Sequence, residues 1–277
     1  MSESIRQVRL AQRPENLPTA DTWQFIEPVE IGEVMRGFGV AEVIESRSDY
    51  YQVGDFCTGF TGIQTHATCH SKSLRKIDPN FAPLSRFMGG LGMPGFTGYF
   101  GLLDICQIAK LKGCRVVGVA GGPEKCGYLR DELKLDAVVD YKQGNIAQQL
   151  EQASPDGIDV YFDAVGGETL DAVLMLMNRL GRIVLCGAIS QYGDMDKQVG
   201  PSNYMQLIAQ SIVMQGFTMR DYMHRTKEAV VDLLTWEAEG KIKFREHILE
   251  GIDCFPDAVD MIYQGKNHGK LMIKLSD

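Results

Sequence analysis

The sequence predicts an α/β protein in which a doubly wound parallel sheet follows a smaller, β-rich domain. The first sign is a set of short β-branched runs separated by glycines between residues 37 and 77, which is typical of small antiparallel sheets. The second sign is an alternation of helical and strand patterns from about residue 97 onward. Strands joined through helices pair in parallel, and helices then cover both faces of the sheet.

The β-rich part contains four predicted strand segments and one tight turn. Val53-Gly54-Asp55 is the turn, because glycine reaches positive φ without steric cost. The strand segments are, in order, "GVAEVIES", "YYQVGDFCTGF", "IQTHATCH" and "SLRKID".

The α/β part begins with a helix, "TGYFGLLDICQIAKLKG", which ends at Gly113 because glycine favours the helix C-terminus. Proline in the first turn of "PEKCGYLRDELK" predicts a second helix. A third helix, "ETLDAVLMLMNRLG", buries one face, since apolar residues recur at helical spacing, namely Leu170, Val173, Leu174 and Met177. The strands between the helices are "CRVVGVA", "LDAVVDY", "DGIDVYFDAV" and "GRIVLCGAIS".

The last part of the chain holds two more helices and a closing strand. "KEAVVDLLTWEAEG" predicts a helix that ends at Gly240. "FPDAVDMIYQGKNHGKLMIKL" predicts a helix, a turn and a strand, and we expect this strand to return to the first domain.

Composition excludes several classes of protein. A net charge of −8 over 277 residues disfavours binding to nucleic acid, because neutralising phosphates needs a basic surface. The first residues lack the apolar core of a signal peptide, and we find no apolar stretch long enough to span a bilayer. Seven cysteines without CxxC pairs indicate reduced thiols, so we expect a cytoplasmic protein without a membrane partner.

The strongest local signal is the strand–turn–helix unit within residues 114–142. Its strand ends in Ala120-Gly121-Gly122 with no acidic residue at the tip, and Lys125 follows in the first helical turn. Glycines let a phosphate approach the backbone, and a lysine supplies a positive charge, which suits the 2′-phosphate of NADP. The alternative is a plain turn followed by a solvated lysine. Tyr141, at the end of the next strand, either contributes to the phosphate site or only packs against neighbouring side chains.

The segment "LCGAISQYG" is the second candidate, because ligands in open α/β sheets bind beyond the carboxyl ends of the strands. Cys186, Gly187 and Ser190 lie at such an end, and Tyr192 could stack or donate a hydrogen bond there. A simple exit from strand to loop is the alternative.

A metal site and a serine nucleophile have little support. The spacing of Cys57, His66, Cys69 and His70 matches no common zinc framework, and the last two point to opposite faces if they lie on a strand. No Gly-x-Ser-x-Gly stretch is present. We therefore expect no metal.

Several segments together resemble one family, the zinc-independent medium-chain dehydrogenase/reductases of the leukotriene B4 dehydrogenase, prostaglandin reductase and curcumin reductase type. The resemblance spans nearly the whole chain and rests on "LPTADT", "IGEVMRGFGVAEVIES", "VGDFCTGF", "LGMPGFTGYFGLLDI", "QIAKLKGCRVVGVAGGPEKC", "LDAVVDYK", "DGIDVYFDAVGG", "CGAISQY" and "GKNHGKLMIKL". It implies a Rossmann-type doubly wound sheet with a GroES-like domain. The implied domains are a catalytic domain over 1–92, an NADP-binding domain over 93–241 and a C-terminal return over 242–277.

The resemblance also implies an activity and a set of site residues. Family members use NADPH to reduce the carbon–carbon double bond of α,β-unsaturated ketones and aldehydes, and they form homodimers. Tyr204 of "SNYMQL" and Tyr192 are the implied catalytic residues. The implied cofactor-binding residues are Gly121, Gly122, Lys125, Tyr141, Cys186, Ile189, Ser190, Tyr192, Phe217, Asn267, Met93 and Thr97.

The sequence departs from the family at two junctions. Family members carry an extra segment near residues 27–28, and near 106–107 they carry the first Rossmann strand with its phosphate turn. Either the printed sequence omits these segments, or the chain lacks them and is a non-catalytic member that keeps partial nucleotide binding and the dimer surface. An intact mass of 30.8 kDa would decide for the second alternative. A methyltransferase of related fold is a third reading, which Lys125 without an acidic partner at the ribose position disfavours.

Overall fold

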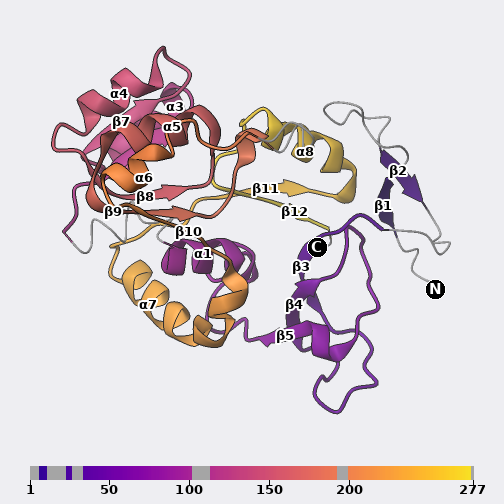
Figure 1. Cartoon of the computed structure of the whole chain (residues 1–277). Helices are drawn as coiled ribbons and strands as arrows, with labels where there is room; N and C mark the ends of the chain where they lie inside the picture. Colours follow the sequence, from indigo (N-terminus) through magenta and orange to yellow (C-terminus); the bar gives the residue numbers. More distant parts are fainter. Residues whose placement is uncertain (1–5, 11–22, 27–33, 102–112, 192–198, 276–277) are drawn as a thin grey trace. The chain divides into compact units, whose positions relative to one another are not determined.

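The computed structural model describes residues 6–10, 23–26, 34–101, 113–191 and 199–275 (Figure 1). The chain divides into two compact units, one formed by Met1–Pro94 with Phe244–Asp277 and the other by Gly95–Lys243. We call these unit 1 and unit 2. In the part of the chain that the structure describes, no helix has both the length and the apolar character needed to cross a membrane.

Unit 1 contains a three-stranded antiparallel sheet in the order β3-β4-β5. Its strands are Phe38–Glu42, Phe56–Phe60 and Leu74–Ile77. The predicted turn before β4 is present, since Gly54 has φ +89° and its N–H donates to the carbonyl of Val43 at 2.8 Å. A second antiparallel pair joins β1 (Gln7–Leu10) and β2 (Trp23–Ile26).

The C-terminal part of unit 1 packs on its N-terminal strand. β11 (Glu246–Glu250) and β12 (Lys270–Lys274) pair in parallel, and α8 (Phe255–Tyr263) lies between them in sequence. Val8 of β1 shares a buried cluster with Ile252 and Phe255. The sequence did not predict β11, because its short run "EHILE" has charged ends.

Unit 2 contains two ladders of parallel strands. β6 (Val117–Ala120) pairs with β7 (Ala137–Asp140). β8 (Ile158–Asp163), β9 (Met177–Leu185) and β10 (Val213–Gly216) form the second ladder in the order β10-β9-β8.

Helices lie on both sides of the second ladder, as a doubly wound sheet requires. Figure 1 shows α4 (Ile146–Ala153) and α5 (Gly167–Leu176) on one side, and α7 (Thr226–Ala238) on the other. One hydrophobic core serves both ladders, because the fully buried Val139 of β7 and Ile183 of β9 belong to the same cluster. The fold is therefore α/β, as predicted.

The helix predicted over "ETLDAVLMLMNRLG" is half right. Leu170, Val173 and Leu174 are buried in α5, but the helix ends at Leu176 and strand β9 begins at Met177. Residue 177 adopts the strand conformation because Met177 pairs with Ile158 of β8 and still buries its side chain in the same core. Hydrophobic spacing alone does not separate these two outcomes, since both bury the same residue.

The strand predicted over "IQTHATCH" is wrong. Residues 65–70 form a loop, and only an isolated bridge between Gln64 and Gln7 extends the sheet there. A polar side chain of this loop satisfies a neighbouring backbone group instead, since His70 Nδ1 accepts the N–H of Lys72 at 3.2 Å. The helix predicted before Gly113 is present as α1 (Met93–Gly101), and its remainder lies outside the described residues.

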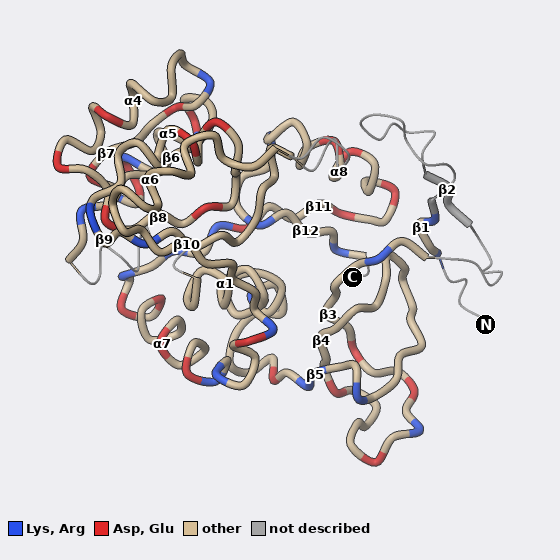
Figure 2. The backbone as a smooth tube through the Cα atoms, in the orientation of Figure 1, with Lys and Arg blue, Asp and Glu red and all other residues tan. Residues whose placement is uncertain are grey.

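Charged residues of both signs are interspersed in the described chain (Figure 2). On α7, for example, Lys227 precedes Glu228 and Asp232. The excess of acidic residues is consequently spread out.

Candidate active site

The first half of the candidate site lies where β6 and β7 end. Ala120 pairs with Asp140, so the two strands finish at the same edge of the ladder. Asp140 Oδ1 accepts the N–H of Gly122 at 2.9 Å and the N–H of Lys142 at 3.0 Å. The sequence prediction of no acid at this tip is incomplete, because the neighbouring strand supplies a carboxylate that fixes the glycine turn.

The two glycines of the turn have separate roles. A Cβ on Gly121 would lie 2.6 Å from Cζ of Tyr141, so the absence of a side chain lets the tyrosine ring lie against the turn. Gly122 has φ +91°, and among the described residues no atom beyond its chain neighbours lies within 4 Å of the position a Cβ would take. Here the chain can bring a ligand close to the backbone, as a phosphate site requires.

Lys125 of α3 (Pro123–Gly127) is half-buried and forms no ion pair with any described residue. Burial lowers the pKa of Lys125, the charge of Lys142 lowers it further, and Glu124 opposes the shift. Two lysine charges therefore interact beside the glycine turn. This arrangement favours an anion.

The second half of the site lies where β8, β9 and β10 end. Asp163 and Leu185 are the last residues of β8 and β9, and they pair with each other. The N–H of Phe217, which follows β10, donates to the carbonyl of Leu185 at 2.8 Å. Phe217 thus lies at the edge where segment 186–190 leaves the sheet.

Segment 186–190 is held against the loop that follows β8. The N–H of Cys186 donates to the carbonyl of Asp163 at 2.8 Å, and the N–H of Ile189 donates to the carbonyl of Ala164 at 3.1 Å. Ser190 donates from its hydroxyl to the carbonyl of Val165 at 2.5 Å. Burial and the nearby Asp163 raise the pKa of the Cys186 thiol, so it is suited to line a site rather than to act as a nucleophile.

The remaining predicted residues are not all brought to these two edges. Tyr204 is 55% exposed beside α6 (Met205–Ala209), and its neighbour Asn203 donates its N–H to Asp171 of α5 at 2.9 Å. Among the described residues no hydrogen bond or ring contact joins Tyr204 to segment 186–190. Met93 and Thr97 are four residues apart on α1 and therefore share one face of that helix. Asn267 belongs to unit 1, and Tyr192 lies outside the described residues.

Sequence reasoning missed Asp140 and Asp163 as site residues. Each is the last residue of a parallel strand, and each carboxylate accepts backbone N–H groups from a glycine-containing loop. For Asp163, the sequence pattern that could have identified it is the acid–x–x–Gly spacing of "DAVGG". An aspartate in such a turn can accept a hydrogen bond from the backbone N–H two residues ahead.

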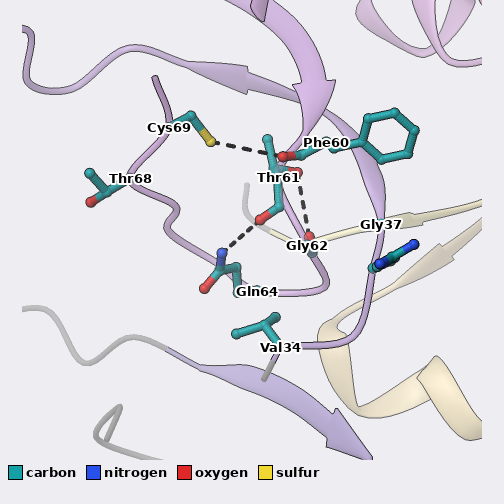
Figure 3. A pocket seen from close by; sticks show the side chains of 9 residues that line it. Val34, Gly37, Phe60, Thr61, Gly62, Gln64, Thr68 and Cys69 are labelled. Atoms are coloured by element: carbon teal, nitrogen blue, oxygen red, sulfur yellow. Dashed lines mark hydrogen bonds between the residues drawn. The ribbon is translucent and has the colours of Figure 1, made fainter. Parts of the chain in front are cut away.

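Unit 1 holds a cavity of about 450 Å³ at the ends of β3 and β4 (Figure 3). Gln64 Nε2 donates to the carbonyl of Thr61 at 2.6 Å across it, and the Cys69 thiol donates to the carbonyl of Phe60. None of the predicted site residues lines this cavity, whose walls are Val34, Arg36, Gly37, Phe60, Thr61, Gly62, Gln64, Thr68 and Cys69. The described residues contain no group of three or more His, Cys, Asp or Glu side chains that could hold a metal ion.

A glycine-lined edge of a parallel sheet, joined in sequence to a small antiparallel β unit, places the chain in the class of two-domain dehydrogenases and reductases. Two family profiles match the chain, a zinc-binding dehydrogenase domain over residues 103–236 and an N-terminal domain of oxidoreductase over residues 24–77.

Relatives from bacteria and mammals give the same result. NADPH-dependent curcumin reductase of Escherichia coli (strain K12) is 38% identical over 284 residues, covering 93% of this chain and 82% of the relative. Prostaglandin reductase 1 of Rattus norvegicus is 39% identical over 271 residues, covering 88% and 82%. The crystal structure of CurA from Vibrio vulnificus in complex with NADPH superposes with a TM-score of 0.86 at 34% identity, covering 98% of this chain and 99% of that one. The chain belongs to the medium-chain dehydrogenase/reductase family, in the group of curcumin reductase and prostaglandin reductase.

The alignment with the curcumin reductase also bears on the two junctions. It runs over 284 positions, more than the 277 residues of the whole chain, although only 93% of this chain takes part. It therefore places gaps in this chain. The junctions near 27–28 and 106–107 themselves lie outside the described residues.

Proposed function

We propose that this protein is an oxidoreductase that uses NADPH to reduce the carbon–carbon double bond of α,β-unsaturated ketones and aldehydes. The observation that carries the proposal is the likeness to relatives named curcumin, prostaglandin and 2-alkenal reductases, together with the basic glycine turn of unit 2. The double bond of such substrates is polarised by the carbonyl group, so hydride addition at the β-carbon moves charge onto the carbonyl oxygen.

The adenosine end of NADPH fits the edge formed by β6 and β7. Gly121 and Gly122 leave room for a phosphate, Lys125 supplies a charge that no described acid neutralises by an ion pair, and Tyr141 adds an exposed hydroxyl. A 2′-phosphate carries close to two negative charges at neutral pH, so this edge distinguishes NADPH from NADH. Lys142 adds a second charge.

The nicotinamide end fits the edge formed by β8, β9 and β10. Cys186, Ile189 and Ser190 provide a fixed backbone there, and Phe217 provides an apolar wall. We assign Tyr192, Met93, Thr97 and Asn267 to the same cleft by family likeness. NADPH, when bound, supplies the hydride.

The chain must also stabilise the enolate that hydride addition creates. We assign this role to the hydroxyl of Tyr204 or Tyr192, which would donate a hydrogen bond to the substrate oxygen. A donor at that position lowers the barrier because it meets charge that appears only in the transition state. Protonation at the α-carbon then completes the reduction.

A single assay tests the activity and its selectivity. Purified protein is mixed with NADPH and a simple enone such as 4-phenyl-3-buten-2-one, and NADPH absorbance is followed while mass spectrometry and NMR identify the product. The proposal predicts the saturated ketone with its carbonyl intact. Formation of an allylic alcohol would contradict it, and the saturated ketone offered as substrate is the matched control.

The second candidate is a family member that binds nucleotide partially and does not turn over. The gaps that the relatives' alignment places in this chain favour it. It predicts NADPH binding by fluorescence titration without enone-dependent loss of absorbance, in a protein whose intact mass is 30.8 kDa.

We further propose that the protein is a cytoplasmic homodimer in which 93–241 binds the cofactor, while 1–92 with 242–277 binds the substrate. β10 supports the dimer, because its outer edge pairs with no described strand and Val213 is 46% exposed. Ile208 and Met205 of the adjoining α6 are 71% and 56% exposed, which adds an apolar patch of the kind that interfaces cover. The six described cysteines are free, as a reducing compartment requires.

A further inference from the structure

Asp163 carries a network that none of the assigned roles uses. It is the last residue of β8 and only 1% exposed. Its Oδ1 accepts the N–H of Val165 at 2.9 Å, the N–H of Gly166 at 2.8 Å and the hydroxyl of Tyr161 at 3.1 Å. One carboxylate oxygen thus shapes the loop between β8 and α5.

The same residue also holds the neighbouring segment through its main chain. Its carbonyl accepts the N–H of Cys186 at 2.8 Å and the N–H of Gly187 at 3.2 Å. The loop that Oδ1 shapes then presents the carbonyls of Ala164 and Val165 to segment 186–190. The side chain of Asp163 therefore shapes the loop that holds segment 186–190, and the main chain of Asp163 holds the same segment directly.

The second carboxylate oxygen makes the arrangement costly. Oδ2 of Asp163 is buried and has no hydrogen-bond partner among the described residues. Burying an unsatisfied polar group is unfavourable, so a neutral residue would suit a site with a purely structural role. Gly166 and Gly167, at φ +69° and +57°, show that the loop also adopts a conformation few other residues allow.

We propose that Asp163 is a positioning residue, which fixes segment 186–190 at the nicotinamide end of the cleft through the loop 164–167. The expected effect of Asp163 on kcat rests on the proposed function, whereas its expected effect on the conformation of segment 186–190 does not. Asp140 offers a matched comparison at the adenosine end, where its Oδ1 accepts two N–H groups and its Oδ2 is likewise buried without a partner.

Hydrogen exchange in the protein without cofactor separates a local from a transmitted effect. Asp163→Ala removes the acceptor of the Val165 and Gly166 amides but keeps the carbonyl that accepts from Cys186 and Gly187. A local role would speed exchange at the first pair alone. The positioning role predicts that the Cys186 and Gly187 amides also exchange about tenfold faster, because the surface that carries them opens more often.

Kinetics and binding complete the test. For Asp163→Ala we expect kcat to fall about tenfold or more while the Kd for NADPH changes less than about threefold, since the displaced segment lies at the reacting end. Asp140→Ala should instead raise the Kd for NADPH by a larger factor than it lowers kcat. Asp163→Asn keeps one oxygen acceptor, and we expect it to restore much of both the protection and kcat.

Leu174→Ala controls for simple loss of stability, because Leu174 is fully buried in α5 and is not among the residues assigned to either edge. The proposal is overturned if the Cys186 and Gly187 amides exchange as in the wild type in both Asp163 variants. It is also overturned if the Asp163 variants lose kcat only in proportion to the unfolded fraction, as Leu174→Ala does. A wild type without enone turnover would remove the proposed function and leave the exchange experiment to decide on Asp163. If Asp163→Ala does not fold, Asp163→Ser, which also removes both carboxylate oxygens, carries the same comparison.

Discussion

The proposed role of Lys125 in the choice between NADPH and NADH is tested directly by Lys125→Met. The side chain is half-buried beside the glycine turn, and its charge interacts with that of Lys142. A hydrogen bond to a charged group contributes about 1.5–3 kcal/mol, and partial exposure reduces this to roughly 1–2 kcal/mol. We therefore expect the Kd for NADPH to rise about 5- to 30-fold. The Kd for NADH should stay unchanged, because NADH lacks the 2′-phosphate.

The assay is a fluorescence titration of each coenzyme against wild type and variant, repeated at several pH values. Because the ammonium of Lys125 is present only below its pKa, the preference for NADPH should decline as the pH rises through that lowered pKa. Lys125→Met should show no such decline. Higher salt should weaken NADPH binding less in the variant, since one fewer charge is screened.

Two controls make the result interpretable. Lys227→Met removes the same charge from α7 and should leave both Kd values unchanged. Lys142→Met removes an exposed charge and should have a smaller effect than Lys125→Met. If Lys125→Met keeps the NADPH/NADH ratio within about twofold of the wild type, the basic glycine turn does not bind the 2′-phosphate.

Four further predictions concern stability and assembly. Leu174→Ala should lower the free energy of unfolding by about 2–5 kcal/mol in urea titrations, because the side chain is fully buried and leaves a cavity. Glu246→Gln should lower the free energy of unfolding by about 1–3 kcal/mol, because it breaks the ion pair with Arg86. In this pair Arg86 Nη1 lies 2.6 Å from Glu246 Oε1. An unchanged urea midpoint would show that the pair is not stabilising. The N–H of Gly122 holds the pKa of Asp140 below its usual value, so the stability difference between wild type and Asp140→Asn should be present above about pH 4 and vanish as the pH falls through the lowered pKa. Ile208→Glu should shift the protein from dimer to monomer in sedimentation analysis, and a dimer that survives it would remove α6 from the interface.

Much of unit 2 could be predicted from sequence because its strands are apolar and bounded by glycine. "CRVVGVA" and "LDAVVDY" both contain the observed strands, and the glycines beyond the first form the observed turn. The boundary between α5 and β9 could not be predicted, since Met177 is buried in the core in either state. Only pairing with Ile158, which lies far along the chain, selects the strand.

The site was less predictable than the fold for a related reason. Gly121, Gly122 and Lys125 are neighbours in sequence, so a local pattern identifies them. Asp140 reaches Gly122 only because β6 and β7 lie side by side, and this pairing is not encoded near either residue. Tyr204 is placed at the reacting end by family likeness alone, since among the described residues no hydrogen bond or ring contact joins it to segment 186–190.

The two edges proposed to bind the cofactor belong to different ladders. β6 and β7 carry the edge proposed for the adenosine end, β8, β9 and β10 carry the edge proposed for the nicotinamide end, and among the described strands no pairing joins β6 to β8. The ladders share a hydrophobic core, so they are one folded unit, but their ligand-facing edges are fixed separately, each by a terminal aspartate. Changes at distant sites without shared partners are additive. Lys125→Met combined with Asp163→Ala should therefore multiply the separate effects on coenzyme affinity and on kcat, and a marked departure from that product would mean that the central part of the sheet couples the two edges.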